Sequence, residues 1–477
     1  MMVTLFPLIS NTPGAVPNYN VGIAETFSWI PVENNANRPL YARAAYITNP
    51  IFANTNSSNG FPITFADSAN LDAFGKLRVS TPFTLFDSKT LHDKNSLFWS
   101  EATINTGSVF FTGDTDASTT LMVSSVGDYA IKQTFQRFNY QPGKSQLCIF
   151  TGLLNPVSNA VKRFGLFTSL TAAPFNVNLG LYFETQTDSF SSIAVVQNNG
   201  NNLVPSVSAR REDWNIDKLD GTGPSGKTLV LSAANIFLID YEWLGVGRVR
   251  FGTVIDGQIC YCHQINNAGS VQGAYIRTPN LPVRGEIRQT GSGVASMKMI
   301  CCTVMSEGGS DFTGVTRSVD TGSAPMGIQI ADQGARRALI GLRLQSTKLD
   351  SVNEILNASV LPLPHSASTV AAFRYEIISN PTLGGSAVTW NVVSNDSNFE
   401  YAVAPNNTVT VSNGNIIASG YATVGQTINL TDYRFEKFLR LGCSVNGARD
   451  TLWLVVTPLQ TSTIDGFHGT LTFIESD

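Results

Sequence analysis

The sequence is short of charged residues and of long apolar runs. Asp, Glu, Lys and Arg make up only 14% of the 477 residues, and the formal net charge is −4. A typical globular protein has about 25% charged residues. Without a basic excess the chain cannot neutralise a phosphate backbone, so we expect no nucleic-acid binding. The apolar runs, such as 236–239 and 452–456, have only the length of a strand, so we expect no insertion into a membrane.

Cysteine is also scarce. Six cysteines in 477 residues are too few for a disulfide scaffold. The start of the sequence, residues 1–10, is apolar but has no basic flank, which is not the pattern of a secretory signal. We therefore expect synthesis in the cytoplasm of the host cell.

What the sequence does contain points to a globular, β-rich protein. Hydrophobic residues make up 43%, and there are 40 Gly and 28 Phe, a balance unlike that of disordered chains or coiled coils. Beyond about residue 71, short runs of alternating polarity are separated by Gly, Asn, Asp or Pro, as in antiparallel sandwiches. We predict an all-β fold of tandem antiparallel, jelly-roll-like β-sandwiches, one over 71–306 and one over 336–477.

Three other segments differ from these alternating runs in composition and periodicity. Residues 1–70 are rich in Pro, Asn and Gly and show no sustained period, which predicts an extended N-terminal arm. Residues 307–335 carry six glycines and few apolar clusters, which predicts a linker. Residues 349–357 are the best of the few helical candidates.

The sharpest motif is a match to the phosphate-loop pattern G-x-x-x-x-G-K-[ST] at 221–228, which reads GTGPSGKT. Phosphate binding by such a loop needs an apolar strand before it and a helix after it. Here a charged segment, 210–214, precedes the loop and the strand-like run 229–231 follows it. We therefore interpret the match as a glycine-rich surface turn and predict no nucleotide cofactor.

Cysteine and histidine residues raise the question of a metal site. On a strand, Cys260 and Cys262 point to one face, whereas the adjacent Cys301 and Cys302 point to opposite faces, so these four with His263 do not make the usual zinc knuckle. We predict buried thiols and no metal ion. No histidine lies in a recognisable pattern with a nucleophile; the four are His92, His263, His365 and His468.

Asp240 and Glu242 are the best pair of carboxylates for glycosidase chemistry. At i and i+2 on a strand they share a face about 7 Å apart, and such enzymes require two carboxyl groups roughly 5–9.5 Å apart. A solvent-facing pair on an amphipathic strand explains the pattern equally well. Aromatic residues make up 10% of the chain and, for most of them, core packing is the expected role; the tryptophans considered are Trp99, Trp214, Trp243, Trp390 and Trp453.

Several segments together resemble a family of virion structural proteins of tailed phages and some large DNA viruses. The segments are DAFGKLRVSTPFTLFDS at 72–88, YQPGKS at 140–145, LDGTGPSG at 219–226, IDYEWLGVGRVRFG at 239–252 and TPNLP at 278–282. The resemblance covers roughly residues 70–305, and 339–344 and 360–363 extend it more loosely. It implies a particle component and no catalytic residues.

The leading hypothesis is therefore a virion structural protein of a DNA virus, with a tailed phage as the expected source, that assembles on or joins capsid, tail or baseplate parts. Its expected partners are copies of itself, in a homo-oligomer such as a trimer, and other virion proteins, with the N-terminal arm wrapping a neighbour. The alternative is a receptor-binding spike or fibre whose C-terminal sandwich recognises host surface glycans. A third hypothesis is a polysaccharide-degrading enzyme that uses Asp240 and Glu242. We predict a protein that is not an enzyme and has no catalytic, cofactor-binding or metal-binding residues.

Overall fold

A computed structural model describes residues 71–476, except for 75–77, 79–81, 187–192, 201–203, 205, 310–312, 325–326, 331–332, 365–371, 424–427, 430–439 and 461–463. The arm predicted over 1–70 lies outside the described residues. By its contacts the chain divides into Met1–Leu71 and Asp72–Asp477, and the second unit holds the fold. Across the described residues, no helix is long and apolar enough to cross a bilayer.

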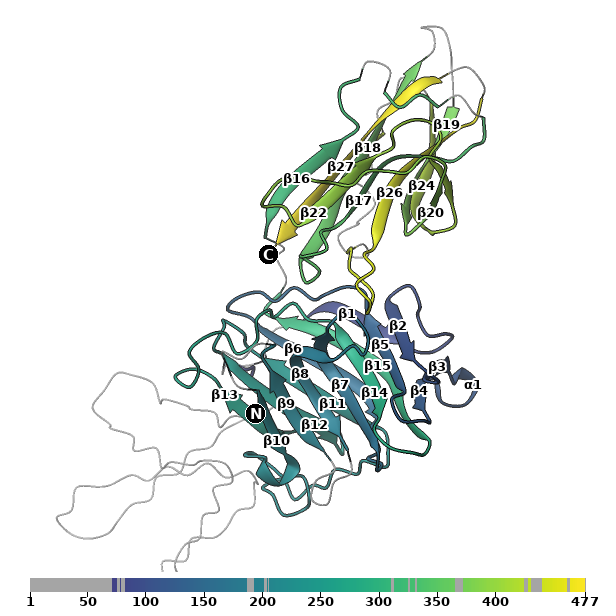
Figure 1. The fold of residues 1–477 in the computed structure, drawn as a ribbon. Helices are drawn as coiled ribbons and strands as arrows, with labels where there is room; N and C mark the ends of the chain where they lie inside the picture. The colour runs from purple at the N-terminus through teal and green to yellow at the C-terminus, as the bar shows by residue number, and fades with distance from the viewer. Residues whose placement is uncertain are drawn as a thin grey trace, which may run out of the picture. The chain divides into compact units, whose positions relative to one another are not determined.

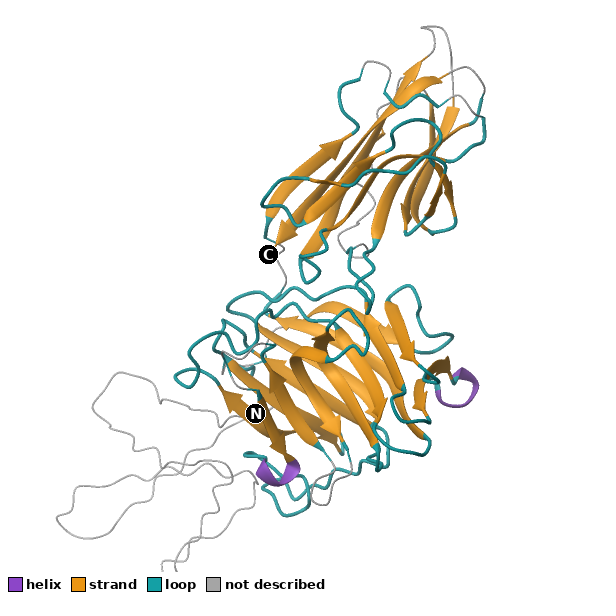
Figure 2. Ribbon diagram, in the orientation of Figure 1, coloured by secondary structure: helices purple, strands orange, loops and turns teal. Residues whose placement is uncertain are grey.

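The described part is all-β, as predicted (Figure 2). Its strands form four antiparallel sheets, and the short helical pieces in the described ranges are α1 (Gly113–Asp116) and a 3-10 turn at Arg211–Asp213. The sheets belong to two sandwiches, each with its own buried core (Figure 1). The tandem arrangement that the alternating runs predicted is therefore confirmed.

The first sandwich pairs an eight-stranded sheet with a seven-stranded one. The larger sheet consists, in order, of β13 (Gln258–Asn266), β12 (Arg248–Ile255), β11 (Asn235–Tyr241), β6 (Ser145–Leu153), β15 (Ala295–Glu307), β4 (Thr119–Val123) and β3 (Ser108–Phe111), with β1 (Phe83–Lys89) on β15. The smaller sheet consists of β10 (Val207–Arg210), β9 (Ala194–Asn198), β8 (Val177–Thr185), β7 (Ala160–Ser169), β14 (Val283–Gln289), β5 (Tyr129–Thr134) and β2 (Trp99–Ile104).

Strand β11 shows how alternation builds this core. Phe237, Ile239 and Tyr241 point into the space between the two sheets, where the Phe237 ring lies 5.8 Å from Phe150 and 4.9 Å from Phe183. Their neighbours Leu238 and Asp240 share the other face of the sheet, because successive side chains on a strand alternate. Both of these side chains are nevertheless fully buried. The outer face of the sheet is therefore covered around them.

The second sandwich contains a four-stranded and an eight-stranded sheet. The first consists of β16 (Val315–Asp320), β27 (Ile464–Ser476), β18 (Val352–Pro364) and β25 (Ile428–Asn429). The second consists of β20 (Thr382–Gly384), β23 (Thr410–Ser412), β17 (Arg337–Leu344), β26 (Thr451–Pro458), β19 (Ala372–Ser379) and β24 (Asn415–Thr423), with β22 (Phe399–Val403) and β21 (Asn391–Val392) beside β17.

Two expectations about this region were wrong. The helix expected over 349–357 falls largely on strand β18, which pairs with β27; residues 352–355 are buried on both faces of the strand, so the run lacks the alternation that predicts a half-buried strand. The segment 307–335, expected to be a linker, contains strand β16, which pairs with β27. The second sandwich therefore begins by Val315 rather than at 336.

A loop of the second sandwich, residues 441–450, packs against the first. The Cys443 amide donates to the Phe135 carbonyl at 3.1 Å, and the Val445 amide donates to Ser100 Oγ at 3.1 Å. The Val445 side chain is buried in a small apolar cluster with Tyr129 and Ile131. This loop therefore holds the end of β19 and the start of β24 close to the turn that precedes β2.

Candidate functional site

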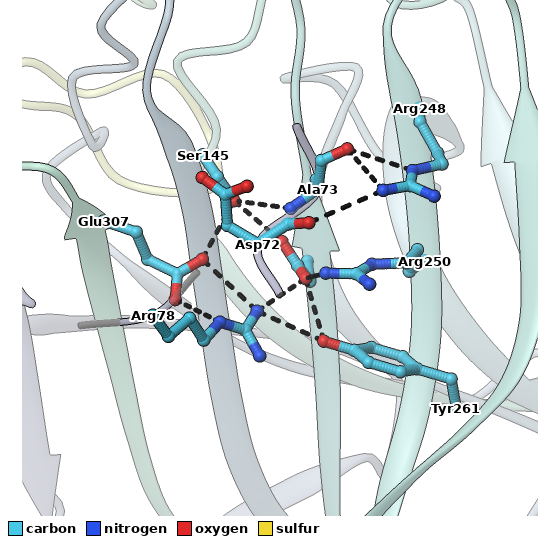
Figure 3. A network of polar contacts seen from close by, with 9 residues as sticks. Asp72, Ala73, Arg78, Ser145, Arg248, Arg250, Tyr261 and Glu307 are labelled. Carbon is cyan, nitrogen blue, oxygen red and sulfur yellow. Dashed lines mark hydrogen bonds and ion pairs between the residues drawn. The ribbon is translucent and has the colours of Figure 1, made fainter. Parts of the chain in front are cut away.

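Two features of the described chain are candidate functional sites. One is a buried ionic network on the first sandwich, and the other is an open groove. The network is centred on Asp240, whose side chain has no exposed surface. Arg78 reaches Asp240 with Nη2 at 2.7 Å and Glu307 with Nε at 2.5 Å. Figure 3 shows that Arg78, Tyr261, Ser145 and Glu307 converge from separate parts of the chain.

The groups that surround Arg78 come from five strands, β6, β11, β12, β13 and β15. Ser145 on β6 donates to Asp240 Oδ1 at 2.8 Å and lies 2.9 Å from Glu307 Oε2, so that its hydroxyl bridges the two carboxylates. Tyr261 on β13 donates to Asp240 Oδ2 at 2.9 Å. Arg250 on β12 forms an ion pair with Asp240. Carboxylates this buried are stable only when paired and hydrogen-bonded, as they are here.

Asp72 and Ala73 are held at the same place through their backbone groups. Arg248 donates to the carbonyl of Ala73 at 2.6 Å and 3.0 Å, and the Ala73 amide donates to Ser145 Oγ at 3.4 Å (Figure 3). Three of the segments that carry the family resemblance, 72–88, 140–145 and 239–252, therefore meet in one network. We call this network, made by Asp72, Ala73, Arg78, Ser145, Asp240, Arg248, Arg250, Tyr261 and Glu307, the anchor.

Burial and charge act against each other in the anchor. Burial lowers the pKa of Arg78, but the charge of Asp240, together with Tyr261 and Glu307, raises it above its ordinary value. Burial, and next the charge of Asp240, raises the pKa of Glu307. Two carboxylates held this close favour protonation of one of them unless a cation lies between them. Arg78 supplies that cation.

The Asp240–Glu242 pair is not the solvent-facing pair that the strand pattern suggested. Asp240 is buried in the anchor, and Glu242, half-buried beyond the end of β11, accepts from the Arg248 amide at 3.0 Å. Burial raises the pKa of Glu242. Tyr241 is buried in the core of the first sandwich, and Trp243 packs against that core. The sequence identified Asp240 but could not show that its partners are Arg78 and Arg250.

The segment that matches the phosphate-loop pattern forms a turn closed by a bridge between Asp220 and Thr228. Its backbone already holds a carboxylate: Asp217 accepts from the Leu219 amide at 2.8 Å and from the Ser225 amide at 2.7 Å. Lys227 Nζ lies 2.5 Å from Asp256, on the neighbouring hairpin. The side chain of Asp217 therefore occupies the position relative to the loop amides that a phosphate would need.

The cysteines and histidines are scattered. Cys262 and Cys302 are buried in the core, Cys260 packs against it, and Cys301 is exposed. His263 Nδ1 accepts from the Asn215 amide at 3.2 Å, and His468 lies beside Thr321. His92 is exposed, and His365 lies outside the described residues. Within the described ranges, no three His, Cys, Asp or Glu side chains are grouped to hold a metal ion.

The groove is the second feature, and no sequence pattern predicted it. It has a volume of about 610 Å³. The turn before β2 supplies Leu97 and Phe98, and the end of β19 and the start of β24 supply Asn380, Asn415 and Ile416. The loop 441–450, described above, holds these parts together. Their separation along the chain explains why no local pattern could reveal the groove.

The groove walls combine an exposed aromatic ring with side-chain amides and two ionisable side chains, Asp450 and Arg440. Phe98 is 46% exposed, and its ring stands edge-on to that of Phe86, with 6.1 Å between the ring centres. Asn380 donates to Asp450 Oδ1 at 2.8 Å, and Asp450 also accepts from the Gly442 amide at 3.1 Å. Burial raises the pKa of Asp450. Gln136 and Asn415 add further amide groups.

The tryptophans follow the core-packing expectation in part. Trp99, Trp214 and Trp453 are buried in the two cores, whereas Trp243 and Trp390 are half-buried against them. Trp390 has the guanidinium of Arg343 over its ring at 4.0 Å. None of the five lines the groove, whose exposed ring is Phe98.

No family model and no curated protein matches this chain. Solved structures with a similar fold over part of the chain include the carbohydrate recognition domain of Emp46p in its potassium-bound form (11% identity, TM-score 0.31, 46% of this chain and 95% of that one). A second is the exoplasmic/lumenal domain of VIP36 in its Ca2+/Man3GlcNAc-bound form (11% identity, TM-score 0.31, 49% of this chain and 93% of that one). A third is the β-glucanase of Bacillus licheniformis (9% identity, TM-score 0.31, 47% of this chain and 99% of that one).

Proposed function

We propose that the described part of this chain is a carbohydrate-binding module that binds neutral oligosaccharides in the groove. The observation that carries the proposal is the groove itself, where an exposed phenyl ring stands beside several side-chain amides. Its volume falls in the range of roughly 300–1,000 Å³ that is usual for ligand sites. The proposed activity is binding without turnover.

The chemistry of the walls suits a sugar. A pyranose ring has an apolar C–H face that packs on an aromatic ring, and hydroxyl groups around its rim that need partners able both to donate and to accept. Asn415 and Gln136 offer an amide N–H donor and a carbonyl acceptor each. Phe98 is held by Phe86, so little side-chain freedom is lost on stacking.

Binding to a panel of neutral and sialylated oligosaccharides tests this function. We expect the full chain to bind neutral members, and Phe98→Ala to weaken binding at least tenfold, because losing an aromatic contact costs about 1.5 kcal/mol. Phe110→Ala is the matched control, since Phe110 is an exposed ring on β3 that does not line the groove. Equal binding by all three proteins would place the sugar elsewhere, and no binding by the wild type would refute the function.

A second candidate function is that of a virion structural protein, and one observation favours it. The segments that resemble the virion family assemble the anchor, which fixes the chain directly after residue 71. A rigid attachment point for a long N-terminal segment suits a protein that is tethered to a particle. The two functions are compatible, because a particle component can also bind glycans.

Deleting residues 1–71 tests the structural role. We expect the truncated protein to keep the thermal unfolding transition of the full chain, because both cores and the anchor lie in the remaining part. It should be absent from purified virus particles when it replaces the wild-type protein. Incorporation at wild-type copy number would contradict a tethering role for the N-terminal segment.

A further inference from the structure

We propose that the groove selects neutral sugars that carry a methyl group, either a 6-deoxyhexose or an N-acetylhexosamine. This inference rests on the proposed function and narrows the class of its ligand. Three apolar side chains that stand exposed in the groove carry it: Leu97, Phe98 and Ile416. The C–H face of a sugar ring needs only one such surface, the phenyl ring. A methyl group on the sugar accounts for the two alkyl side chains.

Each of these three side chains leaves a large apolar surface in water. Leu97 is 67% exposed and Ile416 is 44% exposed, beside the exposed ring of Phe98. Single apolar residues scattered over a surface are ordinary, but several gathered in one hollow mark a binding site. Leu97 and Phe98 are neighbours on the turn before β2, whereas Ile416 comes from the start of β24. A ligand in the groove therefore meets apolar groups from two separate parts of the chain.

A β-bulge lies where β24 enters the groove. Ile377 on β19 pairs with Ala418, whereas the next residue of β19 pairs with Ile416, so one residue of β24 is left over. Bulges re-aim side chains and are common next to functional sites. Here two successive residues of β24, Asn415 and Ile416, are both exposed and both line the groove. This strand therefore offers an amide and a branched alkyl group at adjacent positions.

A sugar with a methyl group matches this combination better than a fully hydroxylated one. The methyl group of a 6-deoxyhexose or of an acetamido group leaves water for a contact with Leu97 and Ile416, which is favourable. A hydroxymethyl group in the same place would exchange its hydrogen bonds to water for contacts with alkyl side chains. The ring hydroxyls keep partners in Gln136 and Asn415, whose side-chain amides both donate and accept.

The charge of the groove favours an uncharged ligand. Among the described residues of its lining, the two ionisable side chains are Asp450 and Arg440, which carry opposite charges. A sialic acid also has an acetamido methyl group, but its carboxylate would need a cation of its own. The inferred ligand class is therefore defined by a methyl group on a sugar without charge.

Titration of the full chain with matched pairs of sugars tests the inference. The pairs are L-fucose with L-galactose, L-rhamnose with L-mannose, and N-acetylglucosamine with glucose, and the members of each pair differ at one substituent. In at least one pair we expect the member with the methyl group to bind at least tenfold more tightly. Saturation-transfer NMR should then show the strongest transfer to its methyl protons. The first two pairs report a 6-deoxyhexose, and the third reports an N-acetylhexosamine.

Leu97→Ala and Ile416→Ala connect this preference with the groove. Both side chains are exposed, so we expect both variants to fold, to keep the affinity for the hydroxylated sugar and to reduce the preference to less than about threefold, since a lost alkyl contact removes the gain from the methyl group. Leu170→Ala is the matched control, because Leu170 is exposed and does not line the groove.

Two results would overturn this inference and leave the proposed function intact. One is equal affinity within every pair while neutral sugars still bind, and the other is an unchanged preference in both Leu97→Ala and Ile416→Ala. Binding of no neutral sugar by the wild-type chain would instead overturn the proposed function and this inference together.

Discussion

Buried charged side chains are the distinguishing residues of this protein. Only 14% of the residues are charged, yet Lys132, Arg250, Arg284 and Glu286 are all almost or fully buried. Arg284 and Glu286 form an ion pair at 2.6 Å, and Glu286 also pairs with Arg163 at 2.7 Å. Removing one partner of such a pair costs about 3–5 kcal/mol, since the other charge stays buried.

Lys132 differs from the others because its ammonium group is hydrogen-bonded to a neutral hydroxyl group. Its Nζ donates to Thr119 Oγ1 at 2.6 Å and lies 5.2 Å from the centre of the Trp99 ring. Burial lowers the pKa of Lys132 from its ordinary 10.5 to about 8, against the opposing charge of Glu101. Between these two values the unfolded chain holds more protons than the folded one, so stability rises with pH in that window.

We therefore predict that Lys132→Met stabilises the protein at pH 7, by up to about 3 kcal/mol, and reduces the rise in stability between pH 8 and 10. A smaller rise remains, because burial also lowers the pKa of Lys162 to about 8. Urea unfolding at a series of pH values measures both effects. Lys89→Met is the control, since the Lys89 side chain is 68% exposed. An unchanged pH slope in Lys132→Met would contradict this explanation.

Strands, the dominant elements, could be predicted from the sequence because alternation is a local property. Strands β11, β12 and β13, for example, all lie in the region beyond residue 71 where short alternating runs predicted strands. The failures also have local causes: residues 352–355 of β18 are buried on both faces and lack the alternation of a half-buried strand, and the glycines of 307–335 conceal β16. Which strands pair is set by contacts between distant segments, and the sequence contains no local signal for them.

The same distinction explains the candidate sites. Asp240 was recognisable as an unusual residue, since it is a carboxylate on an apolar strand. In the same network, Arg78 lies 162 residues before Asp240 and 229 residues before Glu307. The groove depends on the packing of loop 441–450, so only the folded chain reveals it.

Loop 441–450 provides a prediction at the scale of elements. A Cβ atom at Gly442 would lie 2.0 Å from the Phe135 carbonyl oxygen, so Gly442→Ala must push the loop off the first sandwich. We expect a loss of about 1–3 kcal/mol in the free energy of unfolding, together with weaker oligosaccharide binding, because the groove walls separate. Denaturant unfolding and a binding titration measure the two effects.

Gly273→Ala is the matched control for this substitution. A Cβ atom there would have a single neighbour, a methyl carbon of Val204 at 3.9 Å, which is ordinary van der Waals contact. We expect its stability to lie within about 0.5 kcal/mol of the wild type. If Gly442→Ala behaved like Gly273→Ala in both measurements, the loop would not hold the groove together.

At the scale of the whole molecule, the low charge and the two cores fit a protein whose role is to bind other molecules. Each sandwich buries its own apolar cluster, so neither depends on a ligand to fold. The anchor supplies a fixed point for the N-terminal segment, and the groove supplies a place for a ligand. We propose that these features together make a particle component that carries a carbohydrate-binding surface.

The most direct test of the central claim is a titration of the full chain with the neutral oligosaccharide that binds best in the panel, at about 0.05 and 0.5 M salt. Stacking on Phe98 and hydrogen bonds to amides involve no net ligand charge, so the affinity should be nearly equal at the two salt concentrations and at least tenfold weaker in Phe98→Ala. An affinity that falls steeply with salt, or that is unchanged in Phe98→Ala, would contradict neutral-sugar recognition in the groove.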